Sequence, residues 1–121
     1  MVSGGKAYDI KERTFQFAVD IVRFLSELPR STAGYALGRQ LIRSGTSIGA
    51  NVEEAAGART KKEFINSMNV AKREARETLF WLRVIKETPL VSDQKVSAVL
   101  IESNELVSIL TTIVKRAEGH S

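Results

Sequence analysis

Cysteine is absent from the 121-residue chain, which excludes a disulfide framework and any metal site built on thiolates. Histidine occurs once, as His120, so the Glu-x-x-His pairs of a di-iron bundle cannot form. Proline occurs twice, and no glycine-rich phosphate loop follows a strand-like segment. These absences predict a protein without catalytic activity, cofactor or bound metal.

Long apolar runs are also missing. No continuous run approaches the roughly 18 residues that would span a bilayer. The first nine residues, MVSGGKAYD, lack the apolar segment of a signal peptide. The sequence therefore predicts a cytoplasmic protein with no membrane partner.

Most of the sequence consists of strong helix formers, with apolar residues recurring at steps of three and four residues. They predict an all-α protein, an antiparallel up-down-up-down four-helix bundle joined by short loops. We expect residues 1–8 to form a flexible N-terminal tail, residues 9–117 a single bundle domain, and residues 118–121 a flexible C-terminal tail. The expected core stripes are Ile10, Thr14, Phe17, Ile21, Phe24, Leu25 and Leu28; Tyr35, Leu41, Ile48, Val52 and Ala55; Phe64, Met68, Ala71, Ala75, Thr78, Leu79, Leu82 and Ile85; and Val96, Val99, Leu100, Ser103, Leu106, Val107, Leu110, Ile113, Val114 and Ala117.

N-cap residues, proline and glycine predict where the helices begin and end. Asp9 is the expected N-cap of the first helix, and Pro29 ends it. Ser31 or Thr32 caps the second helix, which runs to about residue 56, and Ser92 or Asp93 caps the fourth. Gly57 is expected in the left-handed conformation after the second helix.

A second set of apolar residues lies beside two of the stripes: Phe15, Ala18, Val19 and Val22 in the first helix, and Ile65, Phe80, Trp81 and Val84 in the third. A solitary bundle needs only one buried face per helix. The surplus therefore indicates a contact between subunits.

The segment 46–64 has small and polar residues where the other helices have bulky ones. Gly45 and Gly49, four residues apart, indicate close approach of another backbone, although a kink in the helix is the alternative.

Polar residues within this segment allow two interpretations. Ser47, Asn51 and Glu54 share one side of the second helix, and Thr60 and Glu63 have capping-box spacing. We expect these five residues to form a structural polar network at the turn between the second and third helices. The alternative is a ligand or catalytic site that uses Asn51 and Glu54.

Basic residues give the chain a formal net charge of +4 and are densest in its middle. Three of them cluster at a helix N-terminus, where the helix dipole disfavours cations, and this placement suits a phosphate-bearing partner. Solvated charges balanced by neighbouring Glu residues are the alternative. The candidate nucleic-acid contacts are Arg39, Arg43, Arg59, Lys61, Lys62, Lys72, Arg73 and Arg76.

The pattern Ser47-Ile48-x-x-Asn51-Val52-x-Glu54, followed by Gly57, Lys61-Lys62-Glu63-Phe64 and Ala71-x-x-Glu74-Ala75-x-Glu77, resembles a known bacterial family. Its members are four-helix-bundle proteins associated with intervening sequences of 23S ribosomal RNA, also called S23 ribosomal proteins. The resemblance covers nearly the whole chain. One departure is Ala55, where many members have glycine.

The resemblance implies a ring-shaped oligomer, commonly a homopentamer, which would use the surplus apolar residues. The chain is also similar to accessory proteins of diversity-generating retroelements, which are basic pentamers that engage nucleic acid and a reverse transcriptase. The family provides no catalytic residues to transfer to this sequence.

We therefore expect a non-enzymatic, oligomeric bundle that binds structured RNA or another nucleic acid through basic residues of its second and third helices. A protein–protein scaffold without a nucleic-acid role is the alternative function. An enzyme that uses Asn51 and Glu54 is the third.

Overall fold

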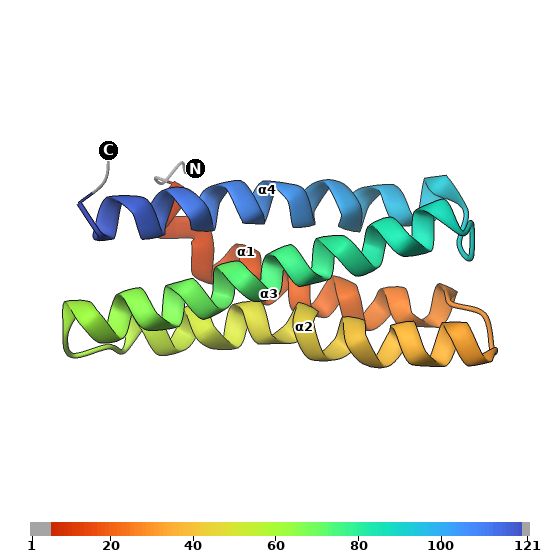
Figure 1. Ribbon diagram of the computed structural model, residues 1–121, viewed down its shortest axis with the longest axis horizontal. Coiled ribbons are helices and arrows are strands. Elements are labelled where there is room, and N and C mark those ends of the chain that lie inside the picture. The colour runs from red at the N-terminus through yellow and green to blue at the C-terminus, as the bar shows by residue number, and fades with distance from the viewer. Residues whose placement is uncertain (1–5, 120–121) are drawn as a thin grey trace.

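Four long helices contain most of residues 6–119, the part of the chain that the computed structural model describes. Helices that follow one another in the sequence lie side by side and run in opposite directions, and α1 also packs on α4 (Figure 1). The described residues form no strand. The predicted all-α, antiparallel up-down-up-down bundle is confirmed. Its elements are α1 (Lys6–Phe24), the 3-10 turn η1 (Leu25–Glu27), α2 (Thr32–Ala56), α3 (Lys61–Glu87) and α4 (Asp93–Ala117).

The first helix differs from its predicted bounds at both ends. It begins at Lys6, so Asp9 lies within the helix and is not its N-cap. It ends at Phe24, before Pro29, and the chain continues as the tighter turn η1. Leu28 is then extended, which is the conformation that a proline imposes on the residue before it. Of the predicted tails, residues 1–5, His120 and Ser121 lie outside the described residues.

Side chains cap α2 and α3 as their sequences predict. The Ser31 hydroxyl accepts a hydrogen bond from the Gly34 amide at 3.1 Å. The Thr60 hydroxyl accepts from the Glu63 amide at 3.1 Å, and the Glu63 carboxylate accepts from the Arg59 amide at 3.0 Å. The bonds to Ser31 and Thr60 each satisfy an amide that the first helical turn leaves without a partner, and the bond to Glu63 holds the amide of the residue before the cap. Ser92 occupies the N-cap of α4 without a side-chain bond.

Gly57 does not have the predicted left-handed conformation. Its φ of −95° and ψ of 6° are accessible to any residue, and its amide bonds back to the carbonyl of Glu54 at 3.1 Å. A tight right-handed turn therefore leads from α2 to α3.

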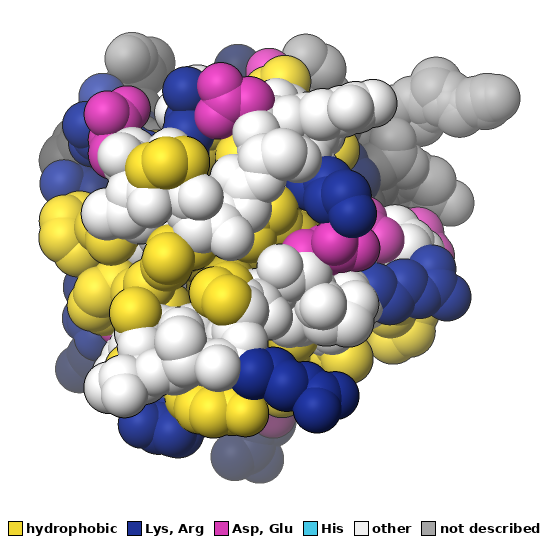
Figure 2. All heavy atoms as spheres, turned by 90° about the vertical axis from the view of Figure 1, so that its right-hand side faces the viewer, with side chains coloured by type: hydrophobic (Ala, Val, Ile, Leu, Met, Phe, Trp, Pro, Cys, Tyr) yellow, Lys and Arg dark blue, Asp and Glu magenta, His cyan; other side chains and the backbone are white. Residues whose placement is uncertain are grey.

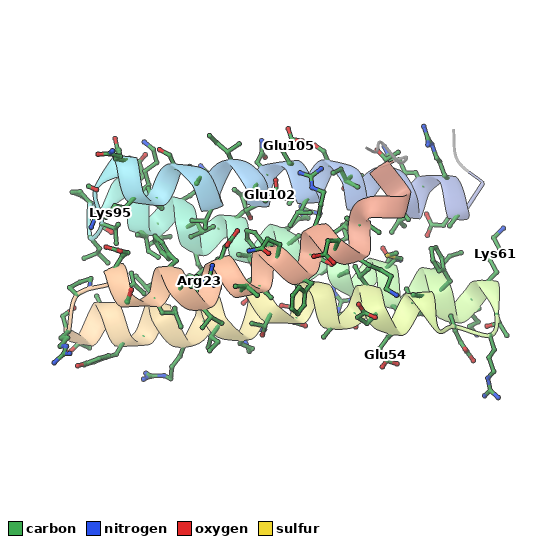
Figure 3. All side chains as sticks on the ribbon, turned by 180° about the vertical axis from the view of Figure 1, so that it is seen from behind. Arg23, Glu54, Lys61, Lys95, Glu102 and Glu105 are labelled. Carbon is green, nitrogen blue, oxygen red and sulfur yellow. The ribbon has the colours of Figure 1, made fainter. Side chains whose placement is uncertain are left out.

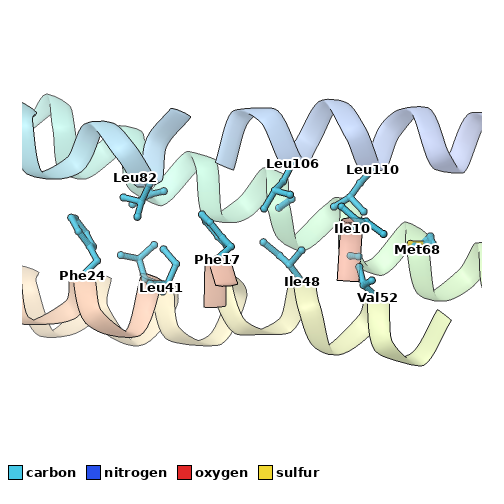
Figure 4. Close-up of a cluster of buried hydrophobic side chains, with 14 of the residues drawn as sticks. Ile10, Phe17, Phe24, Leu41, Ile48, Val52, Met68, Leu82, Leu106 and Leu110 are labelled. Carbon is cyan, nitrogen blue, oxygen red and sulfur yellow. The ribbon is translucent and has the colours of Figure 1, made fainter. Parts of the chain in front are cut away.

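The core lies along the axis of the bundle, where apolar side chains from all four helices meet (Figure 4). The predicted stripes supply it, with one clear exception. Tyr35 is 57% exposed, because it lies on the outer side of α2 rather than on the stripe of Leu41 and Ile48. Each fully buried Leu, Ile or Phe side chain contributes about 1.5–3 kcal/mol to the free energy of unfolding.

Small residues let α1 and α2 pack closely, as the glycine spacing predicts. A β-carbon at Gly49 would lie 3.1 Å from the carbonyl oxygen of Thr14. A β-carbon at Gly45 would lie 3.0 Å from side-chain atoms of Ile21. The two glycines therefore face α1, and α2 continues through both as one helix.

The helix α4 is long and apolar enough to cross a membrane by length and composition alone. Its apolar residues are interrupted by polar and charged ones, including Glu102 and Glu105. Its buried residues, from Val96 to Val114, lie on one stripe that packs into the bundle. In this fold α4 packs one face into the bundle, and its other faces are more exposed.

Candidate nucleic-acid interface

The eight basic residues that the sequence singles out do not form one cluster. One group, Arg59, Lys61 and Lys62, is exposed where α2 turns into α3. Another lies in the middle of α3, where Arg73 and Arg76 are exposed and Lys72 is half-buried. Arg39 lies towards the other end of α2, about 26 Å of helix from the turn that follows Ala56. The remaining candidate is Arg43.

Arg43 is bound to acidic side chains of the neighbouring helix. Its guanidinium donates to Glu74 at 3.2 Å and also to Glu77, and it bonds Gln40 on its own helix at 3.1 Å. The Trp81 indole donates to the same Glu77 carboxylate at 3.1 Å. A guanidinium held between two carboxylates has little charge left for a phosphate, so the arrangement joins α2 to α3.

The helix α3 carries most of the excess positive charge. It contains seven basic and four acidic residues, a net charge of +3 out of the chain's formal +4. Three of the four carboxylates are engaged, since Glu63 caps the helix and Glu74 and Glu77 hold Arg43. The basic residues of α3 that form no ion pair with a described side chain are Lys61, Lys62, Lys72, Arg73, Arg76 and Arg83.

Basic residues elsewhere are more often neutralised by partners on a neighbouring helix. Lys11 lies 3.7 Å from Glu53, and Lys95 lies 2.9 Å from Glu27. Arg13 binds Glu102 through two hydrogen bonds, at 2.6 and 3.0 Å. Figure 3 shows this side of the molecule, with Glu102 and Glu105 on α4. Lys11, Arg13 and Lys95 are therefore paired with carboxylates of neighbouring elements, whereas Arg23 on α1 forms no ion pair with a described side chain.

Two of the polar residues predicted to form a network are joined. The Asn51 amide donates to the Ser47 carbonyl at 2.9 Å and to its hydroxyl at 3.1 Å. Glu54 takes no part: its side chain is exposed, points away from the bundle (Figure 3) and bonds no other described residue. Thr60 and Glu63 form a separate capping pair. The surroundings of Asn51 and Glu54 thus lack the enclosed carboxylate that a catalytic site would need.

Arg83 is a basic residue that the candidate set omits although the structure places it beside the α3 group. It is exposed and lies seven residues after Arg76, hence on the same side of the helix. Phe80, between them, is 53% exposed. The seven-residue spacing is a sequence signal that identifies Arg83. Among the described side chains, no group of three or more His, Asp or Glu residues lies close enough to hold a metal ion.

Comparison with known proteins places the chain in a family. A family model described as 23S rRNA-intervening sequence protein matches residues 6–112. The chain belongs to the 23S rRNA-intervening sequence protein family. The family resemblance seen in the sequence is thereby confirmed.

A solved structure of another protein agrees with this assignment. It is described as a protein with unknown function from the S23 ribosomal protein family of Bacteroides thetaiotaomicron, and the two chains are 35% identical. The match covers 88% of this chain and 98% of that chain, with a TM-score of 0.81. None of the curated proteins matches the chain. The 23S rRNA-intervening sequence protein family thus defines the fold without defining a molecular activity.

Proposed function

We propose that this protein is a non-enzymatic homo-oligomer that binds structured RNA or another nucleic acid through basic side chains of α2 and α3. The observation that carries the proposal is the net charge of +3 on α3, most of whose basic side chains form no ion pair with a described residue. Phosphate contacts by Lys and Arg supply most of the affinity of such complexes because they release condensed counterions. The matching family model is described as 23S rRNA-intervening sequence protein, a description that agrees with an RNA partner.

The turn between α2 and α3 supports the same proposal. Arg59, Lys61 and Lys62 stand at the N-terminus of α3, where free amides and the helix dipole already favour an anion. Basic side chains lower helix stability there, so their presence suits a phosphate ligand better than it suits folding. Together with Lys72, Arg73 and Arg76, they extend the basic surface along much of α3.

A salt titration with two charge-matched variants tests the proposal. The test variant replaces Lys72, Arg73 and Arg76 with Gln, and the control variant replaces Lys11, Arg23 and Lys95 with Gln. Both lose three positive charges, but the control residues lie on α1 and α4. Binding of a labelled structured RNA is followed by fluorescence anisotropy over a range of salt concentrations.

We expect only the test variant to lose affinity and salt dependence. Each lost phosphate contact reduces the slope of log K against log salt by about 0.7–0.9. No detectable RNA binding by the wild type at low salt would refute the proposal. Equal losses in the two variants would show a response to net charge alone and would refute the proposed surface.

A protein–protein scaffold is the second candidate function, and exposed apolar side chains favour it. Phe15, Val22 and Ile42 are all more than 40% exposed on α1 and α2. Contact with other protein chains would remove this surface from water. A defined oligomer together with no affinity for any nucleic acid would support the scaffold.

A further inference from the structure

A groove between α3 and α4 has the features of a ligand site. Its volume is about 500 Å³, which is within the range of small-molecule sites. Leu79, Leu100 and Ile101 provide apolar walls, and Asn104 provides an amide that can both donate and accept hydrogen bonds. Arg83, Lys86 and Glu87 complete the lining.

A second hollow, of about 270 Å³, lies on the outer side of α3 and is lined in part by the same residues. Arg83 and Glu87 line both, and Phe80, Val84 and Thr88 complete the second. The Phe80 ring meets Trp81 edge-on at 5.1 Å between ring centroids and is 53% exposed. An exposed aromatic ring therefore stands one helical turn from an arginine that lines both hollows.

Glu87 is the carboxylate that lines both hollows, and the basic side chains around it outnumber it, which favours an anionic occupant. Arg76 precedes Phe80 by four residues and Arg83 follows it by three, so the three side chains share one side of α3. Neither arginine forms an ion pair with a side chain in the described part of the chain. Lys86 has a partner, Asp93, at 3.9 Å. Figure 2 shows the end of the molecule that carries the α3–α4 connection, where hydrophobic side chains lie beside Lys and Arg side chains.

We propose that Phe80 and the α3–α4 groove bind unpaired nucleotides of single-stranded RNA, whose phosphates lie on Arg76 and Arg83. This inference rests on the proposed nucleic-acid function and adds the form of the nucleic acid. Unpaired bases expose apolar faces and polar edges, which match Phe80, the leucine walls and the Asn104 amide. A duplex keeps its base faces stacked inside, so it offers this surface only phosphates.

The test compares one RNA strand in two forms. A fluorescein-labelled strand of about 12 nucleotides, within the site sizes of single-strand-binding domains, is used alone and annealed to its complement. Its affinity for the full-length protein is measured by anisotropy at low salt. The variants are Phe80→Ala and, as a control, Phe15→Ala, since Phe15 is an aromatic of similar exposure in the single chain but lies on α1, on the surface that the proposed oligomer would cover. Light scattering gives the mass of each variant.

We expect Phe80→Ala to weaken single-strand binding by about tenfold, the usual loss when a stacking ring is removed, with little change for the duplex. Phe15→Ala should leave the ratio of single-strand to duplex affinity unchanged. Arg83→Gln should weaken both forms, because it removes a phosphate contact.

Three results would overturn the inference, and they differ from one another. Absence of binding to both RNA forms removes the proposed nucleic-acid function as well. Binding to both forms with an affinity ratio that Phe80→Ala does not alter removes only the assignment to unpaired nucleotides. A lower oligomeric mass for Phe80→Ala shows that a second protein chain covers this surface instead.

Discussion

Two glycines of α2, Gly34 and Gly38, differ in how much space they leave for a side chain. A β-carbon at Gly34 would lie 1.9 Å from the carbonyl oxygen of Pro29, which is backbone and cannot rotate away. A β-carbon at Gly38 would meet only the ends of the Leu28 and Leu25 side chains, at 3.4 and 3.8 Å. Glycine is therefore required at position 34 by the loop that leads into α2, whereas at position 38 it only lowers helix propensity.

Alanine at position 34 should destabilise the protein, and alanine at position 38 should stabilise it. We expect Gly34→Ala to lower the free energy of unfolding by about 1–3 kcal/mol, because the loop must move. Gly38→Ala should raise it by up to about 1 kcal/mol through helix propensity. Urea denaturation of both variants measures the difference. A stabilised Gly34→Ala protein would contradict the close contact with Pro29.

Buried hydroxyl groups offer a second comparison between like residues. Ser44 and Ser103 are both fully buried. The Ser44 hydroxyl donates to the Gln40 carbonyl at 3.0 Å and accepts from Thr78 at 2.8 Å. The Ser103 hydroxyl has no hydrogen-bond partner among the described residues. A buried hydroxyl without a partner costs about 1–3 kcal/mol.

Removing the two hydroxyls should therefore have unequal effects. Ser103→Ala should raise the free energy of unfolding by about 1 kcal/mol, because it removes the unsatisfied group. Ser44→Ala should lower it by about 0.5–1.5 kcal/mol, because the hydrogen bond between Ser44 and Thr78 is lost while Thr78 keeps its bond to the Glu74 carbonyl. Thermal or urea unfolding gives both values. Destabilisation by Ser103→Ala would indicate that its hydroxyl is satisfied.

Individual residues show what the sequence could and could not predict. Apolar residues at helical spacing, such as Leu41 and Ile48, were placed correctly because burial follows periodicity. The predictions for Tyr35 and Gly57 are wrong. The exposure of Tyr35 and the backbone angles of Gly57 depend on how the neighbouring segments pack. The clash at Gly34 involves a loop, and helical periodicity contains no signal for it.

Among the helices, α2 and α3 are joined by a polar clamp as well as by the core. Arg43 reaches from α2 to Glu74 and Glu77, and the Glu74 side chain is only 17% exposed. Removing the guanidinium would leave a largely buried carboxylate without its counter-charge. The clamp assigns Arg43 to folding, whereas Arg73 and Arg76 remain available to a ligand.

This division of roles predicts opposite phenotypes for arginines on neighbouring helices. Arg43→Gln should lower the free energy of unfolding by about 1–2 kcal/mol and leave RNA affinity nearly unchanged. Arg73→Gln together with Arg76→Gln should weaken RNA binding and change stability by less than about 0.5 kcal/mol. Urea denaturation and anisotropy on the same samples measure both effects. A loss of affinity in Arg43→Gln that equals the loss in the α3 variant would contradict the division.

The clamp also shows why the candidate site was only partly predictable. The sequence identified the basic residues and placed them on α2 and α3, since composition and helix bounds are local properties. Which arginine meets a carboxylate depends on the register between two helices, and 31 residues separate Arg43 from Glu74 in the chain. Capping pairs such as Thr60 and Glu63 were predictable because both partners lie within one turn.

At the scale of the whole molecule, the α1–α2 surface remains incompletely covered. Phe15, Val22, Tyr35 and Ile42 are exposed there. A shallow hollow of about 190 Å³ opens between α1 and α2 beside Phe15. Another, of about 410 Å³, lies beside Ile42, between α2 and the segment of η1 and the loop that precedes α2. A ring requires each copy to present two different surfaces, and this apolar surface suits one of them. The proposed oligomer would bury it against another copy.

A charge placed on that surface should separate the subunits without unfolding them. Ile42→Glu puts a carboxylate where a neighbouring subunit would exclude water, so we expect dissociation to single chains with helix content unchanged by circular dichroism. Thr112→Glu, at an exposed position on α4, is the control and should keep the wild-type mass. Multi-angle light scattering measures all three proteins. A wild-type mass of five subunits would support the pentamer that the family resemblance implies, two subunits would contradict it, and one would refute oligomerisation altogether. If Ile42→Glu kept the wild-type mass, the contact between subunits would have to lie on a different surface.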